Sequence, residues 1–238
     1  MDQTLGLIGS GMIGGTIARL AVSAGLDVVL SNSRGPETLS DLVDSLGEHA
    51  RAATPEEAAV AGDWVIATIP FKAYKQLPAA ALAGKTVLDT MNYSPDRDGN
   101  FADLDSGSVT SSSLVQQHLA QAKVVKAFNN VDFVHLGKLA RPSGAADRSA
   151  LPIAGDDADA KQKAIHLLDL LGYDAFDAGN LAESWRSEPN TPVYVQAYLG
   201  SRPENLTPEE GQKWFFESPG VTVSLDRVKE LIESAKRS

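Results

Sequence analysis

Three glycines near the N-terminus, Gly9, Gly11 and Gly14, have the spacing of a turn that binds phosphate groups. The first allows a tight turn, the second lets backbone approach a pyrophosphate, and the third lets a helix pack closely against a strand. Free N–H groups at the start of that helix attract anions. An apolar run (5–8) precedes the turn, and a helical pattern and a second apolar run (28–30) follow it. This order predicts a βαβ unit that binds a dinucleotide.

The end of the second apolar run indicates which dinucleotide binds. NAD sites usually place Asp or Glu there to accept hydrogen bonds from the ribose, but this segment reads Ser31, Asn32, Ser33 and Arg34. Ser33 can donate a hydroxyl hydrogen bond, and the planar, permanently charged guanidinium of Arg34 suits a phosphate. We therefore predict NADP(H) as the cofactor, with its 2′-phosphate held by this pair. A solvated arginine in a turn is the alternative.

Composition excludes several classes of function. The chain has 238 residues, 43% of them hydrophobic, a formal net charge of −10 and no cysteine. The acidic charge argues against nucleic acid as a partner, because general binding to a phosphate backbone needs a basic face. The lack of cysteine excludes disulfides and thiol chemistry, and no His or carboxylate cluster has metal-ligand spacing, so we expect no metal. With neither a signal-peptide pattern nor a membrane-length apolar run, we expect a cytoplasmic protein without a membrane partner.

Apolar runs that alternate with helical patterns predict an α/β fold, a doubly wound and mostly parallel Rossmann sheet. After the βαβ unit, the predicted strands are residues 64–69, 86–89, 124–127, 151–155 and 173–177. The polar, Gly/Ser-rich segment 96–113 is predicted to be a flexible loop over the site. We divide the chain into an NADP-binding Rossmann domain, residues 1–178, and a small C-terminal helical portion, residues 179–238. The C-terminal portion is expected to supply acceptor-site or oligomer contacts.

The sequence offers few acid–base groups for catalysis. His135 follows a predicted strand closely enough to reach the ligand crevice, but a structural or solvated histidine is favoured. Lys126 could act as a base, but a strand lysine that faces solvent or a carboxylate is favoured. We therefore predict no catalytic side chain. Direct hydride transfer between two cofactors fits this inventory, because such a reaction needs little acid–base help.

Several blocks of the sequence resemble the family of NADP-dependent coenzyme F420 oxidoreductases. Besides the glycine turn and the Asn-Ser-Arg element, they are Val-Lys-Ala-Phe-Asn at 125–129 and Ala-Gly-Asp-Asp at 154–157. The resemblance covers residues 6–191 and implies hydride transfer between NADPH and the deazaflavin F420, with F420 as co-substrate. It also implies a site. The expected cofactor-binding residues are Gly9, Ser10, Gly11, Met12, Ile13, Ser31, Asn32, Ser33, Arg34, Thr68, Ile69, Pro70 and Ala127. The acceptor is expected near Asn92, Phe128 and Asn129.

Two departures from the family pattern leave the acceptor open. The stretch 35–38 lacks a basic residue that the family often has there, and the chain continues beyond residue 201. The alternatives are an NADPH-dependent reductase of another flavin, ferric, carbonyl or imine substrate, and a non-catalytic NADP(H)-binding sensor. Trp214, Phe215 and Phe216 are adjacent in a helical pattern, so they cannot all face one core. We expect at least one to face the acceptor cleft or a second subunit, and we favour a homodimer.

Overall fold

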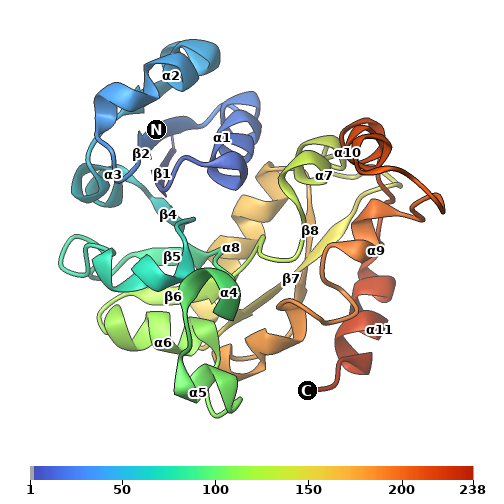
Figure 1. The fold of residues 1–238 in the computed structure, drawn as a ribbon. Helices are drawn as coiled ribbons and strands as arrows, with labels where there is room; N and C mark the ends of the chain where they lie inside the picture. Colours follow the sequence, from blue (N-terminus) through green and yellow to red (C-terminus); the bar gives the residue numbers. More distant parts are fainter. Residues whose placement is uncertain (1–2, 238) are drawn as a thin grey trace.

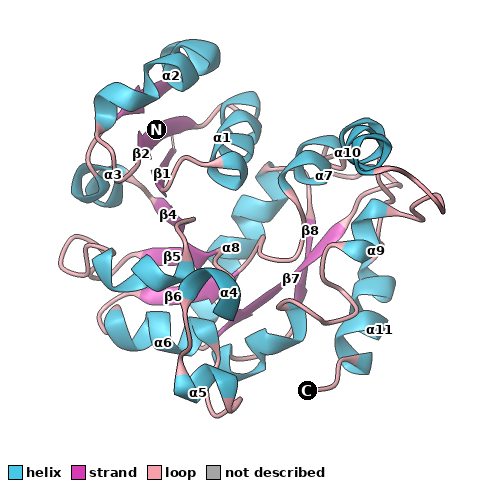
Figure 2. Ribbon diagram, in the orientation of Figure 1, coloured by secondary structure: helices cyan, strands magenta, loops and turns pink. Residues whose placement is uncertain are grey.

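The computed structural model describes residues 3–237, and within them eight strands form one sheet in the order β3-β2-β1-β4-β5-β6-β7-β8 (Figures 1 and 2). Neighbouring strands are parallel except β6 and β7, which are antiparallel. The strands are β1 (Thr4–Ile8), β2 (Asp27–Ser31), β3 (Ala50–Ala52), β4 (Trp64–Ala67), β5 (Thr86–Asp89), β6 (Lys123–Lys126), β7 (Ala150–Gly155) and β8 (Asp174–Asp177). The predicted Rossmann-like α/β fold is confirmed.

Helices cover the sheet and extend beyond its last strand. They are α1 (Met12–Ser23), α2 (Ser40–Leu46), α3 (Pro55–Ala61), α4 (Pro95–Asp98), α5 (Ala102–Asp105), α6 (Ser111–His118), α7 (Phe133–Lys138), α8 (Ala158–Leu170), α9 (Gln196–Leu199), α10 (Pro208–Glu217) and α11 (Leu225–Ser234). Four 3₁₀ segments join them: η1 (Pro36–Leu39), η2 (Gly47–His49), η3 (Phe71–Gln76) and η4 (Leu181–Ser187). Within residues 3–237, no helix combines the length and the apolar character that crossing a membrane requires.

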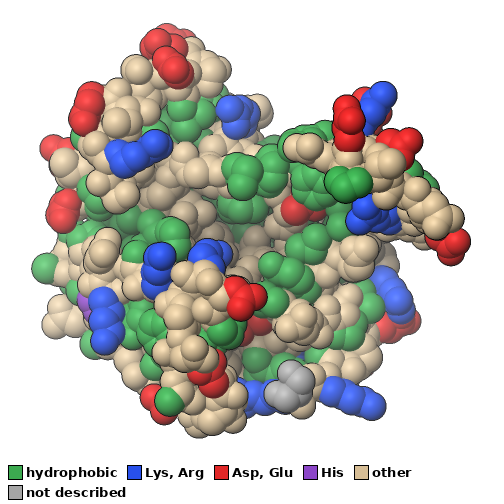
Figure 3. Space-filling model, in the orientation of Figure 1, with side chains coloured by type: hydrophobic (Ala, Val, Ile, Leu, Met, Phe, Trp, Pro, Cys, Tyr) green, Lys and Arg blue, Asp and Glu red, His purple; other side chains and the backbone are tan. Residues whose placement is uncertain are grey.

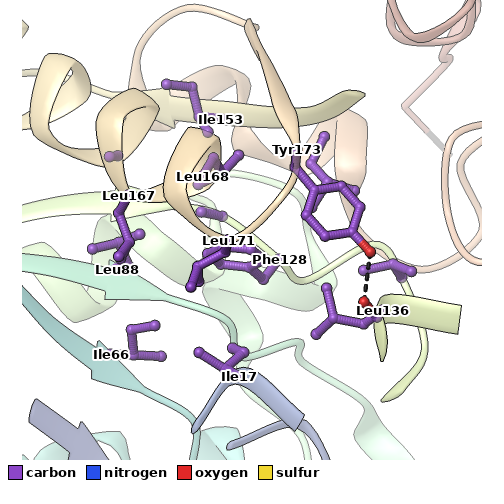
Figure 4. Close-up of a cluster of buried hydrophobic side chains, with 14 of the residues drawn as sticks. Ile17, Ile66, Leu88, Phe128, Leu136, Ile153, Leu167, Leu168, Leu171 and Tyr173 are labelled. Atoms are coloured by element: carbon purple, nitrogen blue, oxygen red, sulfur yellow. Dashed lines mark hydrogen bonds between the residues drawn. The ribbon is translucent and has the colours of Figure 1, made fainter. Parts of the chain in front are cut away.

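Side chains that alternate along the central strands enter two separate hydrophobic clusters. Ile66 and Leu88 belong to one cluster, which includes Ile17 of α1, whereas their neighbours Val65 and Val87 belong to the other. Successive side chains of a strand point to opposite faces of a sheet, so the two clusters lie on its two faces. Figure 4 shows the first cluster, with side chains from both the strands and the helices packed together. Continuous apolar strands are expected when both faces are covered.

The C-terminal helices belong to the same packed body as the sheet. Val228, Leu231 and Ile232 form the buried face of α11, and all three join the first hydrophobic cluster together with Tyr198. The hydroxyl of Tyr198 donates a hydrogen bond to the carbonyl oxygen of Ala150, on β7, at 2.9 Å. A division of function at residue 178 stays a prediction, but the packing across this position is continuous.

Two predictions about local structure are wrong. The segment 96–113 is not a flexible loop, because it contains α4, α5 and the start of α6. Its Phe101 ring packs 5.4 Å from Phe71 and 5.6 Å from Tyr93, so an aromatic cluster orders a stretch whose composition suggested mobility. The strand predicted over 64–69 ends at residue 67. The sequence analysis also missed β3, which has only three residues, Ala50–Ala52, none of them with a β-branched side chain.

Candidate active site

The three glycines of the N-terminal turn have different surroundings. Gly9 has φ = 105°, and a Cβ built on it would lie 2.3 Å from the carbonyl oxygen of Thr68. A Cβ on Gly14 would lie 2.2 Å from the carbonyl oxygen of Gly9. Only glycine fits these two positions, because the turn and the helix approach backbone there. A Cβ on Gly11 meets no protein atom within 4 Å. The backbone there faces open space, as the pyrophosphate of a dinucleotide requires.

Gly11 is also the N-cap of α1, and no side chain caps that helix. The first N–H groups of a helix have no partner within the helix, so this end can bind an anion. The side chains of Ser10 and Ser31 form hydrogen bonds within the protein, and their contacts with a cofactor stay a prediction. The hydroxyl of Ser10 donates to the carbonyl oxygen of Ser31 at 2.9 Å, and the buried hydroxyl of Ser31 donates to the carbonyl oxygen of Leu7 at 2.8 Å. The two serines hold the ends of β1 and β2 together.

Asn32 shapes the turn that presents Arg34. Its Oδ1 accepts a hydrogen bond from the backbone N–H of Arg34 at 2.8 Å, and its Nδ2 donates to the Thr38 hydroxyl at 2.8 Å. Ser33 and Arg34 are exposed. Among residues 3–237, no carboxylate forms an ion pair with the Arg34 guanidinium. The turn therefore offers a cation and a hydroxyl to solvent, and both could contact a phosphate group.

A cleft of about 660 Å³ begins at the N-terminus of α1. Seven residues predicted for the site line it: Gly11, Met12, Ile13, Thr68, Ile69, Pro70 and Asn92. Its other side is formed by residues 93–97, by Phe133 of α7, and by Pro189, Asn190 and Tyr194 from the segment before α9. Figure 3 shows the hollowed face of the molecule, with hydrophobic side chains along the rim. The cleft thus joins the glycine turn to a segment far along the chain.

Three residues predicted to contact ligand are buried instead. Ala127 and Phe128 are 0% and 1% exposed, and Figure 4 shows the Phe128 ring inside the first hydrophobic cluster, beside Leu171. The chain reverses at Phe128, whose φ of 58° is unusual for a non-glycine residue and turns its ring into the core. Asn129 is 4% exposed, so it is also closed off from the cleft. None of the three lines the cleft, and their contact with a ligand stays a prediction.

The polar residues after β6 hold the far wall of the cleft, defined here as residues 187–195. Asn129 donates hydrogen bonds to the carbonyl oxygen of Ser187 at 2.8 Å and to Oδ1 of Asn92 at 3.1 Å. Asn130 donates to the carbonyl oxygen of Val193 at 3.1 Å, and its own carbonyl oxygen accepts from the N–H of Val195 at 2.8 Å. These amides therefore position the wall and contribute to the site indirectly.

Lys126 is a structural charge rather than a base in the cleft. Its side chain is fully buried, and its Nζ lies 3.5 Å from the Asp89 carboxylate and 3.6 Å from the Glu188 carboxylate. The ammonium also donates to the Ser111 hydroxyl at 3.1 Å and to the carbonyl oxygen of Met91. The favoured interpretation, a lysine paired with a carboxylate, is confirmed.

His135 is also structural. It is 0% exposed, and its Nδ1 lies 2.8 Å from the carboxylate of Asp132. Its ring packs 5.7 Å from that of Phe215. His135 does not line the cleft, although Phe133, two residues before it, does.

Tyr194 is a residue of the cleft that the sequence analysis missed. Burial raises the pKa of its phenol, and the nearby Arg97 guanidinium opposes that shift. Arg97 itself donates hydrogen bonds to the Asp98 carboxylate at 3.0 and 2.8 Å. The polar pair Asn129–Asn130, which begins three residues after the end of β6, is the one sequence signal that could have indicated a docked segment here.

The fold is Rossmann-like, and the glycine turn at the mouth of the cleft has the features of a dinucleotide-binding protein. Residues 4–93 match the family model "NADP oxidoreductase coenzyme F420-dependent". This match confirms, over that part of the chain, the resemblance predicted from the sequence, and it supports an NADP-dependent oxidoreductase.

Two solved structures and one protein sequence are similar to this chain. The crystal structure of a hypothetical protein, SMa0349 from Sinorhizobium meliloti, is 27% identical with a TM-score of 0.70, over 82% of this chain and 94% of that one. A protein from Arthrobacter sp. FB24, provisionally assigned as an F420-dependent NADP-reductase, is 23% identical with a TM-score of 0.64, over 77% of this chain and 87% of that one. The Escherichia coli (strain K12) protein YjhV is 42% identical over 53 residues, which are 22% of this chain. That match spans 39% of the length of YjhV.

Proposed function

We propose that this protein transfers a hydride between NADP(H) and the deazaflavin F420 or a similar acceptor. The observation that carries the proposal is the continuity of the cleft from the glycine turn to the far wall. A nicotinamide beside Thr68–Pro70 would face the part of the cleft lined by Asn92, Arg97 and Tyr194. An acceptor in that part would meet the C4 position of the nicotinamide, as direct hydride transfer requires.

In this proposal each part of NADP(H) has a matching group in the protein. The pyrophosphate lies at the N-terminus of α1 beside Gly11, where the space for a Cβ is open. The 2′-phosphate contacts Ser33 and Arg34, which are exposed at the end of β2. The nicotinamide lies along Thr68–Pro70 and supplies or receives the hydride. Asn92 lies on the acceptor side. The family match supports NADP(H), and the acceptor is inferred from the family description.

The decisive experiment mixes the protein with NADPH and one acceptor at a time. F420, FMN, FAD, a ferric chelate and a cyclic imine are compared, and both the reduced nicotinamide and the acceptor are followed by absorbance. We expect F420 to give the fastest oxidation of NADPH, and NADH to be a poorer donor. If another acceptor is turned over faster, that compound and not F420 is the acceptor in the proposed reaction. Tight binding of NADPH without turnover of any acceptor would indicate a non-catalytic sensor.

We also propose that the protein is a homodimer and that α10 lies in the subunit contact. Phe216 of this helix is 48% exposed. The rings of Phe215 and Phe216 each lie 6.1 Å from that of Phe133, so the aromatic segment packs at the rim of the cleft. Exposed aromatic side chains are enriched in the cores of protein interfaces.

A further inference from the structure

Two tyrosines line the cleft, and their hydroxyl groups differ. The hydroxyl of Tyr93 donates to the carboxylate of Asp105. In the described part of the chain, the hydroxyl of Tyr194 has no hydrogen-bond partner, and Tyr194 lines the same cleft as Arg97, whose charge acts on its phenol. We propose that Tyr194 is a catalytic residue that donates the proton accompanying hydride transfer. This inference rests on the function proposed above and adds the acid that the sequence analysis did not find.

The backbone holds Tyr194 firmly in place. The next residue, Val195, has φ = 43°, although β-branched residues strongly disfavour the left-handed region. Such a conformation persists only where the surroundings enforce it, and strained residues of this kind cluster at functional sites. Here Asn130 enforces it, because its carbonyl oxygen accepts from Val195 at 2.8 Å and its amide donates to Val193 at 3.1 Å. Both neighbours of Tyr194 are therefore tied to one buried residue, Val195 to its backbone carbonyl and Val193 to its side-chain amide.

The other polar groups of the cleft are poorer proton donors. Arg97 is bound to the Asp98 carboxylate, and a guanidinium does not lose its proton in proteins. The Asn92 amide donates to the carbonyl oxygen of Asn129 at 2.7 Å. The Ser94 hydroxyl is an aliphatic alcohol and a far weaker acid than a phenol. The carboxylates of this side come from α4: Asp98 is bound by Arg97 and by the N–H groups of residues 72 and 94, and Asp96 is exposed.

The charges around Tyr194 suit proton donation. Burial raises the pKa of the phenol above its usual value, so the group keeps its proton at neutral pH. The positive charge of Arg97 acts against burial and lowers the pKa of the phenol. The same charge would stabilise the phenolate that remains after donation. A general acid must hold its proton until the reaction and release it then.

The reaction balances as follows. The C4–H bond of NADPH breaks, and its electron pair forms a new C–H bond on the acceptor. A heteroatom of the acceptor takes the proton from the Tyr194 hydroxyl. The phenolate then takes a proton from water. In total, NADPH, the acceptor and one proton give NADP⁺ and the acceptor reduced by two electrons.

The test compares Tyr194→Phe with Tyr74→Phe, using the acceptor that the wild type turns over. Tyr74 is buried on η3, stacks on Phe71 at 5.0 Å and does not line the cleft. We expect Tyr194→Phe to lower kcat by about 100-fold or more, the usual size of general acid catalysis, with the Kd for NADPH and the unfolding temperature unchanged. We expect Tyr74→Phe to keep the wild-type kcat.

The pH profile separates proton donation from a structural role. The wild-type kcat should stay constant from about pH 6 to about pH 9, because the phenol stays protonated there. In Tyr194→Phe, kcat should fall as the pH rises, because solvent must then supply the proton. Wild-type kcat in Tyr194→Phe, or a lowered kcat with an unchanged pH profile, would overturn this inference alone. A wild type that oxidises NADPH with none of the acceptors would overturn the proposed function, and this inference with it.

Discussion

The Nζ of Lys126 lies 3.6 Å from the carboxylate of Glu188 and joins the end of β6 to the far wall of the cleft. The same ammonium lies 3.5 Å from the carboxylate of Asp89 on β5. Lys126 and Asp89 are both fully buried. One positive charge therefore balances two carboxylates, one of them closed off from water. The Lys126 ammonium thus connects the carboxyl ends of β5 and β6 to the far wall of the cleft, beside the proposed acceptor site.

Replacement of Lys126 by Met should lower the free energy of unfolding by about 3–5 kcal/mol, because it leaves the buried carboxylate of Asp89 without a counter-charge. Denaturant unfolding measures this loss. Lys123→Met is the matched control, because Lys123 begins the same strand but its side chain is 52% exposed in its ion pair with Asp157. An exposed pair contributes less than about 1 kcal/mol. Equal losses in the two variants would show that burial of the charge cluster has no energetic consequence.

Substitutions of Gly11 and Gly14 should have different effects, the first on cofactor binding and the second on stability. Gly11→Val should abolish binding of NADPH with little loss of stability, because the new side chain fills the pyrophosphate space and meets no protein atom within 4 Å at its Cβ. Gly14→Ala should destabilise the fold, because its Cβ would lie 2.2 Å from the carbonyl oxygen of Gly9. Calorimetric titration and thermal unfolding measure the two effects. NADPH binding retained by Gly11→Val would place the cofactor elsewhere.

Arg34→Ala should weaken binding of NADPH by about 1.5–3 kcal/mol, the contribution of a hydrogen bond to a charged group. Binding of NADH, which lacks the 2′-phosphate, should change little. Titrations with both nucleotides check this, with Arg227→Ala as a control, because Arg227 lies on α11 and pairs with Glu230. If Arg34→Ala weakens the binding of NADPH and NADH equally, the guanidinium does not contact the 2′-phosphate.

Phe216→Glu should dissociate the proposed homodimer, because it places a charge in an apolar contact. Sedimentation velocity at micromolar concentration distinguishes dimer from monomer. Val60→Glu is a suitable control, since Val60 is 64% exposed but lies on α3. A wild type that sediments as a monomer would rule out the dimer. An intact dimer in Phe216→Glu would place the contact on another surface.

Local patterns were enough for much of the fold. A glycine can adopt a positive φ that other residues disfavour, so its presence after an apolar run predicts a turn. Gly9 does so, with φ = 105°. A helix cap depends on neighbouring residues in the same way: Thr54 stands directly before Pro55, and its hydroxyl accepts a hydrogen bond from the N–H of Glu57 at 3.2 Å. The apolar runs of the central strands required a sheet covered on both faces. These features depend on neighbours within a few residues, which the sequence lists directly.

The sequence by itself determined the βαβ unit, the glycine turn and the Rossmann class, because each follows from residue type and period over short stretches. Only the tertiary structure decided what lies opposite the turn. Asn129 meets the backbone of Ser187, 58 positions along the chain, and the left-handed turn at Phe128 sends a predicted ligand contact into the core. The long-range hydrogen bonds of Asn130 to Val193 and Val195 place Tyr194 in the cleft. Contacts between distant residues depend on how whole elements pack, and no local period of the sequence encodes that packing.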